Sequence, residues 1–353
     1  MPYPDLKPDP NFDRLKTIFA LKQPDRVPFI ELFLDEEIMV SLREAPFSAD
    51  PARRWQEIAD LYFRLGYDYV PASTGLGFPY HTVAAEDTAP LSRGRRSWVQ
   101  EGGGAIQTWE DFERYPWPLP KDEHYLPIEY AAAARLDGMG LIPIGPGGVL
   151  ENVMWVMGYG PMSYAMADQP DLVQAVFDRV GGTLVKAFDH MAGHQAVGAV
   201  FLGDDMGFKT QTMMSPEEMR KYVFPWQRRI AEAVHAHGKP LLLHACGNLD
   251  AVMDDLIDYV GIDAKHSFED IITPVTEAKR KWGGRIAILG GLDLDFLVRS
   301  TPEQVRSRTR EVLEVCMPGG GYALGTGNSV ANYVPVPNYL AMLEEGWRLG
   351  RYT

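Results

Sequence analysis

Short apolar runs alternate along the chain with longer stretches whose apolar residues recur at helical spacing. The short runs are bounded by proline, glycine and charged residues, which is typical of buried strands between turns. We predict eight strands, at residues 26–35, 67–74, 141–146, 199–205, 239–246, 261–266, 286–293 and 321–328. We predict helices at residues 11–22, 51–65, 127–138, 150–158, 170–193, 215–237, 250–259, 273–282, 301–316 and 337–348.

Strands that alternate with helices form a parallel sheet, and eight such units close into a barrel. We therefore predict an α/β fold, a (β/α)8 TIM barrel, as one domain over residues 1–353. A doubly wound open sheet is the alternative. The barrel is favoured because no Gly-x-Gly-x-x-Gly turn follows the first strand.

Residues 75–140 interrupt this alternation after the second strand. We predict an insertion there, with a hairpin of strands at 95–99 and 105–109 joined by Gly102-Gly-Gly104. Insertions between a barrel strand and its helix usually cover the site face. We expect the same placement for this one.

Polar residues recur where the predicted strands end, although barrel interiors favour Val, Ile and Leu. They are Glu31, Asp35, Thr74, Asp204, Asp205, His244, Cys246, His266, Asp293, Thr326 and Asn328. Since barrel enzymes place their chemistry at these ends, we predict that Glu31, Asp205 and His266 are catalytic and manage a proton. The predicted substrate contacts are Asp204, Asp293, Thr326 and Asn328.

Structural roles are the alternatives for several of these side chains. Asp204 or Asp205 would cap the following loop, Asp293 would cap a turn, and Glu31 would form an ion pair.

His244 and Cys246 lie two residues apart at the end of the fifth strand. Alternation along a strand places both side chains on one face, and imidazole with thiolate is a donor pair that zinc prefers. A catalytic zinc needs a third protein ligand, for which His266 and Glu31 are the first candidates and Asp204, Asp205 and Asp293 the others. The alternative is a buried cysteine beside a hydrogen-bonded histidine. Cys316 precedes a glycine run and is expected to be structural or on the surface.

The net charge and the cysteine content of the chain argue against some classes of partner and location. The 353-residue chain carries a formal net charge of -14, which argues against nucleic acid or an anionic membrane surface. Two cysteines give no disulfide framework, and neither a signal pattern nor a membrane-length apolar run is present, so we expect a cytoplasmic enzyme acting on a small molecule.

Four motifs in order resemble the uroporphyrinogen decarboxylase superfamily, which includes cobalamin-dependent methyltransferases. They are Phe201-Leu-Gly-Asp-Asp-Met-Gly-Phe208, Leu243-His-Ala-Cys-Gly-Asn248, Ala287-Ile-Leu-Gly-Gly-Leu-Asp293 and Leu324-Gly-Thr-Gly-Asn328. The resemblance implies a (β/α)8 barrel. It also implies methyl transfer between a corrinoid, carried by a separate partner protein, and a thiol or pterin.

The branch within the superfamily is indicated by departures from the decarboxylase pattern. The stretch at 29–37 is acidic where the decarboxylase is arginine-rich, and Thr326 stands in place of its late histidine. His244 and Cys246 match the zinc ligands of the methyltransferases, whereas Thr326 also replaces their third ligand, a cysteine. We therefore predict a metal-assisted methyltransferase.

Two other functions stay open. A lyase of the decarboxylase type would seat a small carboxylated substrate on Lys209, Lys265 and Arg285. A metal-storage or ligand-binding barrel is the non-enzyme alternative.

Overall fold

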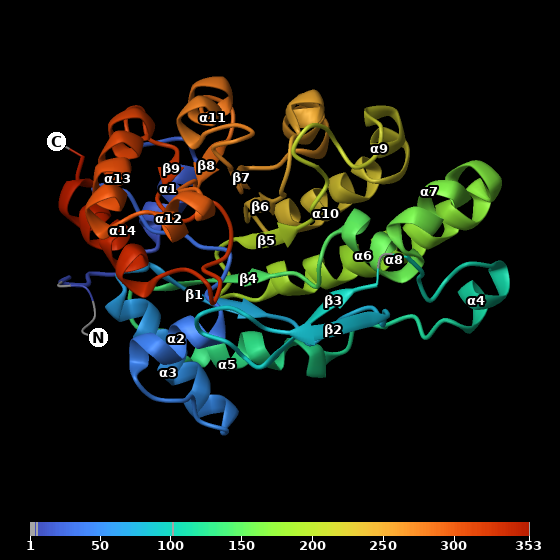
Figure 1. Ribbon diagram of the computed structural model, residues 1–353, viewed down its shortest axis with the longest axis horizontal. Coiled ribbons are helices and arrows are strands. Elements are labelled where there is room, and N and C mark those ends of the chain that lie inside the picture. The colour runs from blue at the N-terminus through green and yellow to red at the C-terminus, as the bar shows by residue number, and fades with distance from the viewer. Residues whose placement is uncertain (1–3, 5, 101, 353) are drawn as a thin grey trace.

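A curled sheet of parallel strands forms the centre of the molecule (Figure 1). The computed structural model describes residues 4, 6–100 and 102–352. Its seven-stranded sheet has the order β1 (Tyr69–Ser73), β4 (Gly140–Ile144), β5 (Val200–Gly203), β6 (Leu241–His244), β7 (Ala264–His266), β8 (Ala287–Leu289) and β9 (Tyr322–Ala323). Strands β5 to β9 are buried along their whole length, as expected for a parallel sheet covered on both faces.

The strand predicted at 26–35 is not a continuous strand. Ile30 N donates to Leu324 O and Leu324 N donates to Pro28 O, so this segment does lie parallel to the chain at β9. Pro28 offers no N–H, and both backbone groups of Glu31 bond to the Tyr69 hydroxyl instead of a neighbouring strand. The other seven predicted strands are confirmed in position.

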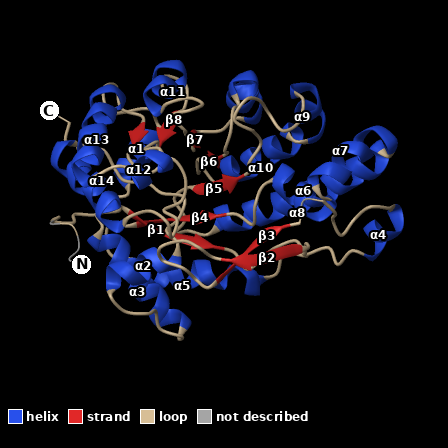
Figure 2. Cartoon of the chain, viewed as in Figure 1, coloured by secondary structure: helices blue, strands red, loops and turns tan. Residues whose placement is uncertain are grey.

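Helices surround the sheet (Figure 2). They are α1 (Asp13–Phe19), α2 (Glu36–Arg43), α3 (Pro51–Arg64), α4 (Trp109–Arg114), α5 (Leu126–Ala134), α6 (Val149–Met157), α7 (Tyr159–Asp168), α8 (Pro170–Gly193), α9 (Pro216–Tyr222), α10 (Phe224–Ala236), α11 (Val275–Trp282), α12 (Leu294–Arg299), α13 (Pro302–Cys316) and α14 (Val336–Leu349). Helices α3, α8, α10 and α11 contact β1, β5, β6 and β8 respectively, so each buries its apolar face against the sheet.

Two helix predictions need correction. The helix expected over 215–237 is two helices, α9 and α10, because Pro225 can stand only in the first turn of a new helix. The segment 250–259 is a 3-10 turn at Asp250–Val252 followed by a π-helical stretch at Asp255–Val260, not an α-helix. A further 3-10 turn lies at Asp122–Tyr125.

The hairpin within 75–140 differs from the one expected. Its arms are β2 (Thr82–Glu86) and β3 (Arg95–Val99), paired antiparallel, and the arm predicted at 105–109 is wrong. The Asp87 carboxylate accepts hydrogen bonds from Ala89 N and Arg93 N, which fixes the turn before β3 rather than after it. Thr108 instead caps α4. Within the part of the chain that the structure describes, every helix is too short or too polar to cross a membrane.

Candidate metal centre at the ends of the strands

Two histidines meet at the carboxyl ends of β6 and β7. Pairing of these strands sets His244 opposite His266, and their Nδ1 atoms lie 2.8 Å apart. His266 Nε2 lies 3.1 Å from Thr326 O, and a carbonyl can only accept. His266 therefore carries its proton on Nε2 and accepts from the Nδ1–H of His244. This leaves the His244 Nε2 lone pair free to bind a metal.

The loop after β5 brings a carboxylate to the same point. Asp205 Oδ1 accepts a hydrogen bond of 2.8 Å from Cys246 N and lies 3.7 Å from His244 Nε2. The two loops meet because Gly207 and Gly247 touch through their backbones. A Cβ on Gly247 would lie 2.0 Å from Gly207 O, and Gly247 has φ +88°. Only glycine fits both demands.

Asp205, His244 and Cys246 each offer one donor atom within 4.8 Å of the other two. Zinc binds sulfur at about 2.3 Å and nitrogen at about 2.0 Å, so tetrahedral ligation separates these two donors by about 3.5 Å. The separation between Cys246 Sγ and His244 Nε2 is 3.5 Å. The donor set and its spacing therefore fit zinc, with a fourth position left for substrate or water.

Two polar groups beside the Cys246 thiol can stabilise its ionised form, which is the form that binds a metal cation. Asn328 Nδ2 lies 3.1 Å and Ser267 Oγ 3.5 Å from Cys246 Sγ, and both groups can donate to a thiolate. Burial, with the Asp205 charge, raises the pKa of the thiol, and burial lowers the pKa of His244 to about 3. Both shifts disfavour charge without a partner. A bound divalent ion would reverse the first by stabilising the thiolate.

Lys265 lies behind this centre. Its ammonium donates to the carbonyl oxygens of Ala245 and Ser267 at 3.2 and 2.8 Å, and burial lowers its pKa to about 8. Its ammonium also lies 4.5 Å from the centroid of the Phe268 ring, and the residue lines a small cavity of about 20 Å³. Arg285, the other cation proposed for a carboxylated substrate, pairs with Asp254 and Asp258 on the surface.

Asp204 and Asp205 are adjacent but act differently. Asp204 is fully buried and accepts from the backbone N–H groups of Val149, Leu150 and Glu151, so it caps α6. Gln227 Nε2 also donates to it. The role is structural, as one alternative held, but the cap is on α6, which precedes β5, and not on the following loop. It leaves Asp204 little capacity to contact a substrate, and Asp205 is the acid that faces the donor cluster.

Glu31 and Thr326 form a second buried pair. Thr326 N donates to Glu31 Oε1 at 3.0 Å, and the Thr326 hydroxyl contacts both Glu31 and Asn328 O. Burial raises the pKa of Glu31 to about 8. A protonated Glu31 would donate to the Thr326 hydroxyl, which would then donate to Asn328 O. Glu31 is thus bound to Thr326, has no ion-pair partner in the described structure, and lies outside the donor cluster.

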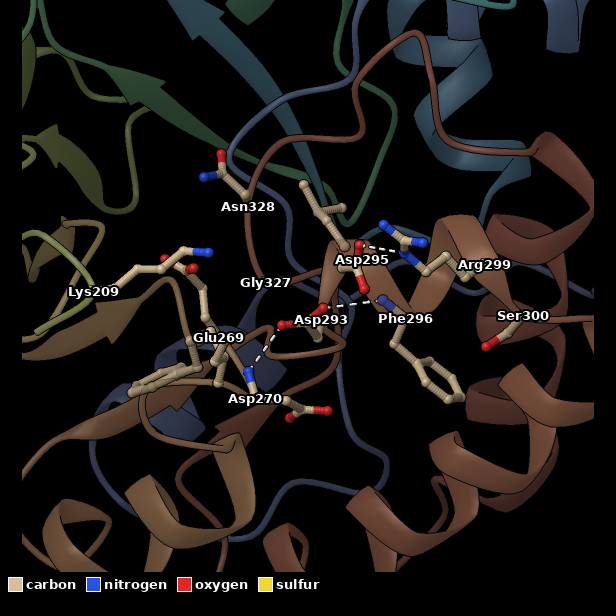
Figure 3. A pocket seen from close by; sticks show the side chains of 13 residues that line it. Lys209, Glu269, Asp270, Asp293, Asp295, Phe296, Arg299, Ser300, Gly327 and Asn328 are labelled. Atoms are coloured by element: carbon tan, nitrogen blue, oxygen red, sulfur yellow. Dashed lines mark hydrogen bonds and ion pairs between the residues drawn. The ribbon is translucent and has the colours of Figure 1, made fainter.

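Two cavities flank the cluster. One, of about 670 Å³, is lined by Asn328, Asp293, Lys209 and Arg299 among others (Figure 3). In it Asp293 caps α12 through Phe296 N and accepts from Asp270 N, so its carboxylate is already bonded. The other cavity, of about 320 Å³, is lined by Asp205 and Glu151 with aromatic side chains. The centre therefore lies between a polar and an aromatic cavity.

Sequence reasoning missed Glu151 and the aromatic side chains. Glu151 lies on α6, and burial with the charges of Asp205 and Asp204 raises its pKa well above its ordinary value. Gly148 N donates to Glu151 Oε2 at 3.4 Å, but a glycine three residues before a glutamate is not a capping-box sequence, so the sequence carried no signal for Glu151. Cys316 is buried at the end of α13, which agrees with a structural role.

Known proteins resemble this chain in sequence and in fold. The family model for uroporphyrinogen decarboxylase (URO-D) matches residues 106–346. A methylated-thiol–coenzyme M methyltransferase of Methanosarcina mazei is 31% identical over 212 residues, which are 59% of this chain and 53% of that relative. The match thus spans about half the length of that relative. A uroporphyrinogen decarboxylase of Anaeromyxobacter dehalogenans is 21% identical over 341 residues, 92% of this chain and 89% of its own.

Another similar protein is the methylcobamide:CoM methyltransferase MtaA of Methanosarcina barkeri, 26% identical over 132 residues, 37% of this chain and 36% of its own. Among solved structures, a methyltransferase from Methanosarcina mazei superposes with a TM-score of 0.67 at 17% identity, covering 94% of this chain and 97% of that one. At this identity the likeness shows the fold. With the family match extending over more than half of its length, the chain belongs to the uroporphyrinogen decarboxylase superfamily, which also contains methyltransferase relatives.

Proposed function

We propose that the protein is a zinc-dependent methyltransferase that moves a methyl group between the corrinoid of a separate protein and a heteroatom of a small molecule. The observation that carries the proposal is the convergence of Asp205, His244 and Cys246 within 4.8 Å. Methyltransferases among the relatives support the reaction class. When bound, zinc would lower the pKa of a thiol or polarise the heteroatom of a methylated substrate.

The protein groups around the centre have separate tasks in this proposal. His266 keeps the His244 lone pair directed at the donor cluster, and Asn328 and Ser267 orient Cys246 Sγ. Asp205 takes the third ligand position in preference to His266 or Glu31, because its carboxylate is the one that reaches both other donors.

We also infer the barrel itself. The segment at 28–30 bonds to Leu324 on one side, and on the other Tyr69 of β1 bonds to Glu31. This segment would close the seven-stranded sheet as its eighth member. The insertion at 75–140 would cover the site face, since Trp98 and Val99 of β3 line the cavity at Asp205.

The activity test follows the absorbance of methylcobalamin when the protein and a thiol acceptor, such as 2-mercaptoethanesulfonate, are added. The proposal expects demethylation that depends on the protein and is lost in Cys246→Ala but kept in Cys316→Ala. Demethylation that is no faster with the protein than without it, for thiol and amine acceptors alike, would contradict it.

A decarboxylase is the second candidate, because uroporphyrinogen decarboxylases are among the relatives. Lys209 and Arg299 line the polar cavity and would seat a carboxylated substrate. They are outnumbered there by Glu269, Asp270, Asp293 and Asp295, which would repel an anion. Release of carbon dioxide from a polycarboxylated substrate would favour this candidate over methyl transfer.

A further inference from the structure

The cavity at Asp205 has a lining unlike that of the polar cavity. Four of its nine lining residues are aromatic, namely Trp98, Trp155, Tyr159 and Phe208. Three more are valine or methionine, and the last two are the carboxylates Glu151 and Asp205. The lining contains no lysine, arginine or histidine. An anionic ligand would therefore meet two acid groups and no basic side chain, whereas a bound cation would favour the carboxylate form of both.

The aromatic side chains are presented to this cavity by distinct elements. Glu151 and Trp155 lie four residues apart on one face of α6, whose other face is buried in the core. Tyr159 begins α7 and is held by a 2.9 Å hydrogen bond from its hydroxyl to Met213 O. Its ring packs edge-on against Phe208, with centroids 5.7 Å apart. Trp98 lies on the hairpin strand β3 and lines the same cavity.

Two of these rings are left unusually open to solvent. The side chain of Trp98 is 47% exposed and that of Phe208 43% exposed. Large exposed aromatic side chains gathered at one cavity indicate a ligand site. Rings around a cavity with carboxylates nearby attract a cation whose charge is spread over methyl groups, because ring faces are negative and methyl groups are apolar.

We propose that this aromatic cavity binds a quaternary ammonium cation, in which Trp98, Trp155, Tyr159 and Phe208 contact the N-methyl groups and Glu151 faces the charge. As a binding site the cavity is independent of any metal. As a substrate site it rests on the proposed function, because Asp205 joins it to the donor cluster.

The test compares choline with 3,3-dimethylbutan-1-ol, a neutral molecule of the same shape, by isothermal titration calorimetry on the full-length protein, with sodium chloride matching the choline chloride. The proposal expects saturable choline binding roughly tenfold tighter than that of the neutral molecule, the size of a desolvated cation–π contribution. Equal affinity would mean an apolar cavity only, and absence of saturable choline binding would equally overturn the proposal.

Variants locate the binding. Glu151→Gln is expected to lower the preference for choline, and Trp155→Leu to remove it. Trp109→Leu changes a 46% exposed aromatic residue on α4 outside this cavity and is expected to change nothing. The comparison of the two ligands in the unaltered protein stands even if a variant fails to fold. Zinc content is measured in the same preparation, so that the two proposals can fail separately. A preference for choline without bound zinc would contradict the proposed function alone. Bound zinc without a preference for choline would contradict this inference alone.

Discussion

The Nδ1 atoms of His244 and His266 lie 2.8 Å apart, and the Thr326 carbonyl on the far side of His266 decides which of them carries the proton. A residue that touches no metal thus sets the tautomer of a proposed ligand. His266→Ala would leave His244 free to turn or to protonate on the wrong nitrogen. We expect zinc affinity to fall roughly 10- to 100-fold, as for other lost partners of ligating histidines.

Chelator competition measures this change. His237→Ala is the matched control, because His237 pairs with Asp189 on the surface. If both variants hold zinc as tightly as the unaltered protein, the hydrogen bond from His244 to His266 has no role in metal binding.

Gly247 tests the contact between the two loops. Gly247→Ala adds a Cβ at 2.0 Å from Gly207 O and also strains a φ of +88°. We expect both a lowered Tm and weakened metal binding, because Asp205 is displaced from Cys246. Gly238→Ala shares the strain, with φ +68°, but its Cβ meets no atom within 4 Å. It should therefore cost only about 1 kcal/mol and leave metal binding intact. Equal effects of the two substitutions on metal binding would contradict this account.

Substitution of Asp204 should affect mainly the stability of the fold, and substitution of Asp205 mainly metal binding. Asp204→Ala removes the cap of α6 and leaves three backbone N–H groups without their acceptor. We expect a loss of about 2 kcal/mol or more in the free energy of unfolding. Asp205→Ala should cost far less stability and remove the metal. Denaturant unfolding and metal analysis of both variants check the contrast, and an equal loss of stability would argue against it.

The buried Glu31 should make the free energy of unfolding depend on pH. Its pKa is raised from 4.5 to about 8 in the folded protein, so the folded state holds a proton that the unfolded state releases. Its contribution to stability is complete below pH 4.5 and falls by about 1.4 kcal/mol per pH unit until the pH passes about 8. Glu31→Gln mimics the neutral acid and should remove this decline.

The measurement is urea unfolding of both proteins from pH 5 to pH 9, with the surface variant Glu110→Gln as control. The gap between Glu31→Gln and the unaltered protein should move in favour of the variant as pH rises. A gap independent of pH would show that Glu31 is ionised throughout.

The hydrophobic pattern was sufficient for strands such as β5, β6 and β8, because each contains a short apolar run and is buried throughout. It failed at 26–35, where Tyr69 replaces a neighbouring strand as partner of Glu31, and at 105–109, where a cap on α4 competes with strand pairing. The first failure depends on hydrogen bonds between residues far apart in the chain, and the second on a local cap between Thr108 and Asp111. Hydrophobic periodicity records neither.

The candidate site was predictable where spacing along one strand sufficed, as for His244 and Cys246. The third donor was not, because Asp205 joins them only through the contact of Gly207 with Gly247 across two loops. The spacing suggested that one of the two acids at 204 and 205 caps the following loop, whereas Asp204 caps α6, an earlier helix. That contact depends on where α6 lies beside β5, which the spacing does not record.

Zinc content of the purified protein tests the central claim most directly, measured by inductively coupled plasma mass spectrometry after equilibration with zinc and removal of the excess. The account predicts one zinc per chain in the unaltered protein and in Cys316→Ala, and almost none in Cys246→Ala, His244→Ala or Asp205→Ala. Zinc retained in all of these variants, or absent from the unaltered protein, would contradict it.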